Sequence, residues 1–143
     1  MNHDLRTLAD RAELNDLLLH MGRALDEHTF DDLNDVLTPD ATGSTRNGSG
    51  TGRDILIAQI EAGNKDHTRL LHRFSSVLIK VDGDTATIRA YITALTGTAE
   101  SLVPTSRRYG LMRDKAVRTP DGWRISELRV EPVFVVDEDT VGA

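Results

Sequence analysis

An aspartate and a histidine stand out because they occupy positions where a core between a helix and a sheet is expected to be apolar. Asp26 ends a predicted helix in the segment RALDEH, and His72 starts a predicted strand, on the face that also carries Phe74 and Leu78. A carboxylate beside an imidazole is the simplest acid–base unit that works without a cofactor, because the carboxylate fixes the ring's tautomer and stabilises its protonated form. If the sheet curls around the helix end, as a twisted antiparallel sheet can, Asp26 and His72 converge in one pocket.

The same two residues also have simpler structural explanations. An aspartate at a helix end is often solvated or bonded to loop amides. A lone histidine on a strand is more often an ordinary core or edge residue than a catalyst. Spacing alone therefore leaves both interpretations open.

The residue types do not favour metal or cofactor chemistry. The chain has no cysteine, which excludes thiolate metal sites, iron–sulfur clusters and a cysteine nucleophile. No two of its five histidines have the i, i+4 spacing, with an intervening glutamate, of a helical zinc site. The glycine-rich stretch 43–52 lacks the lysine of a phosphate-binding Walker loop. We therefore expect no metal ion and no cofactor.

The size and charge of the chain narrow the class of protein. Its 143 residues suit one domain spanning 1–143, with a core at about 8–135. The formal charge of -6 disfavours nucleic acid and anionic membranes as partners, because both normally require a basic face. No apolar run approaches the ~18 residues of a membrane span. The first ten residues are too charged for a signal peptide, so we expect a cytoplasmic protein.

The first half of the chain is predicted to be helical. Between Leu5 and Leu25 the apolar residues keep helical spacing. They are Leu14, Leu17, Leu18, Met21 and Leu25. A short second helix is expected over 29–37, ending before Pro39, and a third helix runs from Ile55 to a stop at residues 63–64. Residues 43–52 are predicted to form a flexible loop.

In the second half of the chain, apolar and polar residues alternate with the two-residue period that is typical of a β-strand. Two hairpins are predicted, one turning at residues 82–84 (Asp-Gly-Asp) and one at residues 119–122 (Thr-Pro-Asp-Gly), and the tail 137–143 is expected to fray. Helices followed by strands favour an α+β fold with the helices on one face of an antiparallel sheet.

The first long strand also suggests a homodimer. Strict alternation directs Val77, Ile79 and Val81 to one face and Phe74 and Leu78 to the other. Three short helices cover only one face of a sheet. We therefore expect a second copy of the chain to cover the other face.

A run of basic residues occurs in one of the later strands. It comprises Arg107, Arg108, Arg113, Lys115 and Arg118. These positions divide between both faces of a strand, which favours a solvated edge strand whose charges prevent aggregation. The alternative is that a subset meets an anionic substrate or acidic groups of the dimer partner.

Three segments together resemble SnoaL-like domains of the nuclear-transport-factor-two-like superfamily. They are DRAELNDLLLHMGRALDEHTFDDLNDVLTPDAT, RLLHRFSSVLIKVDGDTATIRAYITA and DGWRISELRV, and the resemblance runs from about residue 8 to residue 135. It implies three N-terminal helices packed on a strongly curved antiparallel sheet, a cystatin-like α+β barrel shaped as a cone with an internal cavity. It also places Asp26 and His72 where dehydratase-like members have a pocket aspartate and a catalytic histidine.

The chain departs from those relatives at several positions. Met21 stands where many of them have a tyrosine, and residues 85–98 contain no second histidine, so Tyr91 is the nearest replacement donor. The Asp–Arg–Asp arrangement of the epoxide hydrolases has only a distant counterpart. That counterpart would be made by Arg89, Arg113 and Glu127.

These observations predict a cofactor-independent lyase, isomerase or cyclase. It would act by acid–base catalysis on a hydrophobic, oxygenated small molecule such as a polyketide-like intermediate. His72 would move a proton next to a carbonyl, oriented by Asp26, while Phe74, Tyr91 and Tyr109 would contact the substrate. The alternatives are a ligand-binding module and a purely structural dimerisation domain with the same fold.

Overall fold

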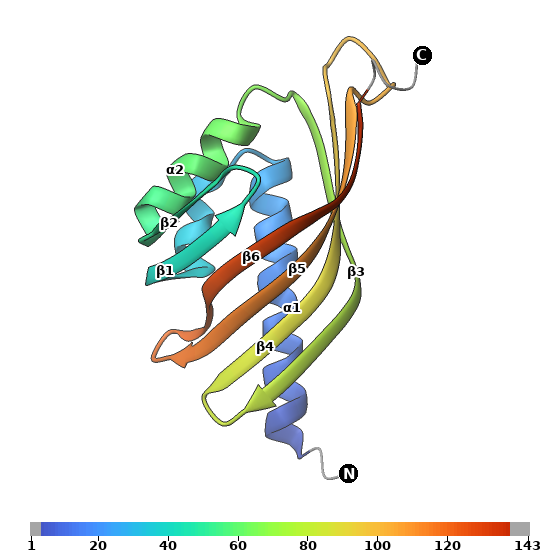
Figure 1. The fold of residues 1–143 in the computed structure, drawn as a ribbon. Coiled ribbons are helices and arrows are strands. Elements are labelled where there is room, and N and C mark those ends of the chain that lie inside the picture. Colours follow the sequence, from blue (N-terminus) through green and yellow to red (C-terminus); the bar gives the residue numbers. More distant parts are fainter. Residues whose placement is uncertain (1–3, 138–143) are drawn as a thin grey trace.

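The computed structural model describes residues 4–137, which form three helices and a six-stranded sheet (Figure 1). The helices are α1 (Leu5–Asp26), the 3-10 helix η1 (Phe30–Asp35) and α2 (Arg53–Asn64). The strands are β1 (Leu37–Thr45), β2 (Gly48–Thr51), β3 (Arg69–Asp82), β4 (Thr85–Gly97), β5 (Ser106–Thr119) and β6 (Gly122–Asp137). Of the tail predicted to fray, residues 137–143, Asp137 is the last residue of β6 and residues 138–143 lie outside the described range.

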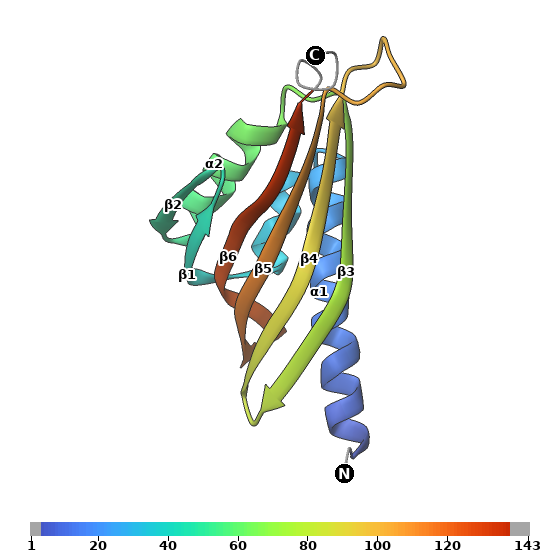
Figure 2. The ribbon, with the colours of Figure 1, turned by 45° about the vertical axis from the view of Figure 1, so that its right-hand side comes forward.

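The sheet has the order β2-β1-β6-β5-β4-β3, so β2 and β3 are its edges. It curves without closing into a barrel, and the helices lie on one side of it (Figures 1 and 2). All neighbouring strands are antiparallel except β1 and β6, which run parallel. The predicted α+β fold, with helices on one face of a curved sheet, is confirmed, and the parallel pair is an addition to it.

Helix α1 provides the main apolar layer on the sheet. Its N-terminus is capped by Asp4, whose carboxylate accepts a hydrogen bond from the amide of Thr7 at 2.8 Å. The predicted stripe is buried, with Leu14, Leu18 and Met21 almost inaccessible to solvent.

No helix among residues 4–137 is both long enough and apolar enough to cross a membrane.

Both predicted hairpins are present. The first turns at Gly83, whose φ of 61° lies in the left-handed region that glycine adopts without strain. Trp123, at the start of β6 in the second hairpin, is fully buried.

The alternation predicted for the first long strand is wrong because β3 contains a bulge. The pairing register of β3 with β4 shifts between Ser75 and Leu78, and Ser76 adopts a φ of 51°. The extra residue turns Phe74 to the same side as Val77 and away from Leu78, which is exposed. Of the two residues predicted for the outer face, only Leu78 lies there, and the homodimer stays a prediction.

The stretch predicted to be a flexible loop is instead a hairpin. Residues 43–52 contain the end of β1 and the whole of β2. Gly43 is required by packing, because a Cβ atom there would lie 2.6 Å from a methyl carbon of Leu56 in α2. The short helix predicted over 29–37 is also only partly right, since η1 ends at Asp35 and Leu37 already belongs to β1.

The basic run lies in β5, between β4 and β6, so the predicted edge strand is wrong. A central strand has both edges hydrogen-bonded and needs no charges to prevent aggregation. The residues do divide between the faces. Cross-strand register places Arg107 and Arg113 outside with Tyr91, whereas Arg108 lies on the inner face with the buried Met112.

Candidate active site

Asp26 and His72 meet where the end of α1 passes the start of β3. Nδ1 of His72 lies 2.7 Å from Oδ1 of Asp26, and the backbone N–H of His72 donates to Oδ2 at 3.2 Å. The side chain of His72 is 7% exposed and that of Asp26 is 28% exposed. The two side chains therefore meet, as expected, and both carboxylate oxygens hold the same histidine.

The close approach of helix and strand depends on a glycine. Gly22 lies one helical turn before Asp26, and a Cβ atom added to it would lie 3.0 Å from the ring of Phe74 and 3.8 Å from Cβ of His72. A methyl group at position 22 would therefore crowd the Phe74 ring where α1 meets β3. This glycine was not predicted as a site residue, because a single glycine inside a helical pattern has no distinctive spacing.

The hydrogen bonds determine the protonation of the neutral ring. An ionised carboxylate only accepts hydrogen bonds, so Nδ1 of His72 carries the proton that faces Asp26. Nε2 then holds the lone pair and is the atom that can accept a proton from another molecule. When it does, the adjacent Asp26 carboxylate stabilises the imidazolium.

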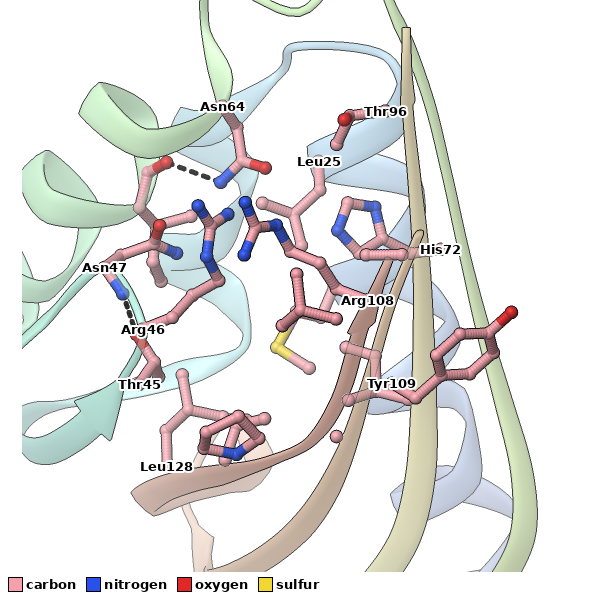
Figure 3. A pocket seen from close by; sticks show the side chains of 18 of the residues that line it. Leu25, Thr45, Arg46, Asn47, Asn64, His72, Thr96, Arg108, Tyr109 and Leu128 are labelled. Atoms are coloured by element: carbon pink, nitrogen blue, oxygen red, sulfur yellow. Dashed lines mark hydrogen bonds between the residues drawn. The ribbon is translucent and has the colours of Figure 1, made fainter. Parts of the chain in front are cut away.

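His72 also lines a partly open cavity of about 140 Å³ between the helices and the concave side of the sheet (Figure 3). The apolar part of the wall comes from α1, α2, β4 and β6. Its residues include Met21, Leu25, Ile60, Ile92, Leu128 and Val130. Six polar residues also line it: Thr45, Arg46, Asn47, Asn64, Thr96 and Arg108. The side chains of Arg46, Asn47, Asn64 and Arg108 lie near one another and form the polar end of the cavity (Figure 3).

Asp26 does not line this cavity. It belongs to an open surface groove together with Leu19, Arg23 and Phe74, and His72 lies between the groove and the cavity. The carboxylate therefore reaches the cavity only through the imidazole ring. This arrangement suits a group that orients a base without contacting the substrate.

The three residues predicted to contact a substrate are not arranged as expected. Phe74 packs over Gly22 and lines the groove instead of the cavity. Tyr91 lies on the outer face of the sheet, 41% exposed, with the guanidinium of Arg89 5.3 Å from its ring centroid. Tyr109 belongs to the cavity wall, but its ring extends away from the cavity (Figure 3).

Strand pairing explains why both tyrosines face outward. Tyr91 pairs with Leu111, and the outward-facing Thr93 two residues along β4 pairs with Tyr109. Both rings therefore follow the outer parity of the sheet. Two residues of the epoxide-hydrolase-like arrangement also lie away from the cavity. Arg89 and Arg113 are cross-strand neighbours on the outer face of the sheet.

Two arginines that were not predicted as site residues extend into the polar end of the cavity. Arg46 comes from the β1–β2 turn and Arg108 from β5 (Figure 3). Burial lowers the pKa of Arg46, and the positive charge of Arg108 lowers it further. The pKa of His67 is lowered by burial and by the same two guanidinium groups. The basic run contained a signal for Arg108, whereas Arg46 lay in a stretch predicted to be flexible.

Comparison with known proteins agrees with this architecture. The family model of the SnoaL-like domain matches residues 6–129, which is most of the chain. The chain belongs to the SnoaL-like domain family. An uncharacterized protein of Mycobacterium tuberculosis is 35% identical to this SnoaL-like chain over 126 residues, covering 82% of each.

Solved structures share the fold at lower sequence identity. The Kfla4162 protein from Kribbella flavida superposes with a TM-score of 0.82 at 24% identity, covering 94% of this SnoaL-like chain and 98% of its own. A protein from Novosphingobium aromaticivorans described as having a cystatin-like fold gives 0.76 at 22% identity, covering 93% and 92%. A hexachlorocyclohexane dehydrochlorinase gives 0.82 at 17% identity, covering 94% and 93%. These similarities establish the fold of the chain.

Proposed function

We propose that this SnoaL-like protein is a cofactor-independent lyase or isomerase that uses His72 as its acid–base group. The observation that carries the proposal is the position of the ring. Nδ1 is held by Asp26 at 2.7 Å, and the same ring lines an apolar cavity that can accept a small molecule. Cofactor-free proton transfer needs an oriented base beside a site for an apolar substrate. Asp26 orients the ring, and the cavity wall is mostly apolar.

The proposed reaction begins when Nε2 of His72 removes a proton from a carbon that lies next to a carbonyl or to a carbon bearing a leaving group. The electron pair of the broken C–H bond then forms an enolate or expels the leaving group. The imidazolium returns its proton to the leaving oxygen in a lyase, or to another carbon in an isomerase. Asp26 stabilises the imidazolium while it lasts. The name of the structurally similar dehydrochlorinase also denotes an elimination, which supports this class of reaction.

Deuterium exchange tests the proton-transfer step without knowledge of the natural substrate. The probe is 2-tetralone in D₂O, a neutral ketone whose acidic α-protons are followed by proton NMR. We expect the protein to accelerate exchange and His72→Gln to reduce the enzymatic rate by about 100-fold or more, because the variant loses the proton acceptor. His20→Gln is the matched control, since His20 is an exposed histidine on α1.

The same assay distinguishes the enzyme from a module that only binds ligands. A binding module would take up 2-tetralone without accelerating exchange. A folded His72→Gln variant that exchanged as fast as the unaltered protein would refute the proposed role of this histidine.

A further inference from the structure

The polar end of the cavity holds two positive charges that only one carboxylate approaches within the described part of the chain. Arg108 projects from the inner face of β5, and Arg46 extends toward it from the β1–β2 turn (Figure 3). Within residues 4–137 the carboxylate that interacts with them is Asp137, whose Oδ1 lies 3.9 Å from a terminal nitrogen of Arg108. That distance is too long for a hydrogen bond, and Asp137 is more than half exposed.

The hydrogen-bonding capacity of Arg108 is also incompletely used. Its Nε is buried and has no hydrogen-bond partner among the described residues. A guanidinium is always charged and offers five donors, so burying one without an acceptor costs free energy. An acceptor placed in the cavity beside Arg108 would remove that cost.

Two neighbouring guanidinium groups also repel each other. The repulsion contributes to the lowered pKa of Arg46, after burial. An anion between them would replace this repulsion with two attractions, and charge-assisted hydrogen bonds to Arg are among the strongest in proteins. The amides of Asn47 and Asn64, at the same end of the cavity, offer additional neutral polar groups (Figure 3).

We propose that Arg46 and Arg108 bind a carboxylate of the ligand, while the apolar body of the ligand lies in the cavity beside His72. A carboxylate is favoured over a larger anion because the cavity is small, about 140 Å³, and because a planar carboxylate matches a guanidinium with two parallel hydrogen bonds. As a statement about the substrate, this inference rests on the proposed function. It names the substrate class as hydrophobic monocarboxylic acids.

Paired probes that differ only in charge test the carboxylate site. Binding of 2-naphthoate and 2-naphthamide, and of phenylacetate and phenylacetamide, is measured by isothermal titration calorimetry at low salt and neutral pH. We expect each acid to bind at least 10-fold more tightly than its amide, and we expect Arg108→Gln and Arg46→Gln each to reduce that preference by 5-fold or more. Asp137→Asn is expected to increase it, because the competing carboxylate is removed.

Arg113→Gln is the matched control for these variants. Arg113 lies on the same strand as Arg108 but on the outer face, so its loss should leave the preference unchanged. Equal affinity for acid and amide in the unaltered protein, or binding of neither pair, would overturn the inference. So would an equal loss of preference in Arg113→Gln, because it would indicate a general effect of surface charge.

The two proposals fail in different ways. Calorimetry with the carboxylates involves no chemistry at His72, and exchange in 2-tetralone involves no anion. A carboxylate preference without deuterium exchange would support the anion site and refute the proposed enzymatic activity. Deuterium exchange without a carboxylate preference would support the enzymatic activity and refute the anion site. Circular dichroism and the Tm of each variant exclude misfolding as the cause of a loss.

Discussion

Helix α1 carries one buried or half-buried aspartate near each end, and the two differ in what surrounds them. Near the N-terminal end, Asp10 receives two hydrogen bonds from Arg118, at 2.7 and 2.8 Å, and a third at 3.0 Å from the indole of Trp123. At the C-terminal end, Asp26 holds His72, whose ring also lines a cavity. Both clusters join a carboxylate of α1 to a nitrogen-bearing side chain on a strand that is distant in the sequence.

The cluster around Asp10 is satisfied within the chain. Arg118 also donates to Asp84 at 3.0 Å and to the carbonyl oxygen of Gly83, and its guanidinium lies 4.6 Å from the centroid of the Trp123 rings. It joins α1 to the turns of both long hairpins. The pKa of Asp10 is lowered to about 2, first by the hydrogen bonds from Arg118 and then by that from Trp123. This cluster stabilises the fold.

The cluster around His72 is less completely paired within residues 4–137. His72, Arg46 and Arg108 line one cavity, and the buried Nε of Arg108 has no hydrogen-bond partner among those residues. The comparison shows that buried charge alone does not identify a site. The informative feature is a polar group whose partner is missing and whose open side faces space for a ligand.

The largest expected effect is a loss of activity without a loss of stability. Asp26→Asn should reduce enzymatic deuterium exchange in 2-tetralone by about 100-fold, because the amide does not stabilise an imidazolium. Its Tm should change by less than about 3 °C, since Asp26 is partly exposed. If a decrease in Tm accounts for the lost activity, the main role of Asp26 is to stabilise the fold, as it is for Asp10.

The converse effect is expected at the other end of α1. Asp10→Asn should lower the free energy of unfolding by about 2 kcal/mol, because it leaves Arg118 without its main partner. Urea denaturation at pH 7 measures this change, and exchange per folded molecule should stay the same. Asp16→Asn, on the same helix and exposed, is the control. A loss of activity in a folded Asp10→Asn protein would contradict the distinction between the two ends.

The pH dependence of stability sharpens the same comparison. Because the folded-state pKa of Asp10 is about 2 and its ordinary value is 3.8, the carboxylate contributes stability that is present above about pH 4 and is lost as the pH falls toward 2. Urea midpoints measured across this range should therefore fall less steeply for Asp10→Asn than for the unaltered protein. Parallel curves would show that Asp10 is not the group responsible.

A smaller effect is expected from the glycine that brings α1 against β3. Gly22→Ala should reduce exchange by about 10-fold, because the added methyl group meets Phe74 at 3.0 Å and shifts Asp26 away from His72. Gly83→Ala tests whether any glycine has this effect, since Gly83 lies in the distant β3–β4 turn. Unchanged exchange in Gly22→Ala would mean that Phe74 moves instead of the helix.

The smallest predicted effect concerns a third carboxyl group. Asp114 is 2% exposed and accepts one hydrogen bond from the amide of Arg129, and burial raises its pKa well above 3.8. In the unfolded chain the Asp114 carboxyl group ionises at a lower pH than in the folded protein. The stability that the protonated carboxyl group contributes is therefore complete below about pH 4 and is lost as the pH rises toward the folded-state pKa. Asp114→Asn does not ionise and should gain about 1 kcal/mol relative to the unaltered protein between pH 5 and pH 8. A constant difference in urea midpoint over that range would contradict this account.

The helices and hairpins were predictable because their signals are local. The apolar spacing from Leu14 to Leu25 defines one face of a helix, and Gly83 supplies the turn that a two-residue hairpin needs. The β1–β2 hairpin was not predictable in the same way. Its glycines and serines have low strand propensity, and it is held by the parallel pairing of β1 with β6 and by packing against α2.

The sequence by itself determined the helix stripe, the hairpins, the family and the candidate pair of Asp26 and His72. Only the tertiary structure decided that His72 separates a groove from a cavity, that Tyr91 faces outward, and that Arg46 and Arg108 share one cavity. The physical reason is register. A bulge of one residue reverses which face a side chain occupies, and the curvature of the sheet decides which distant residues meet.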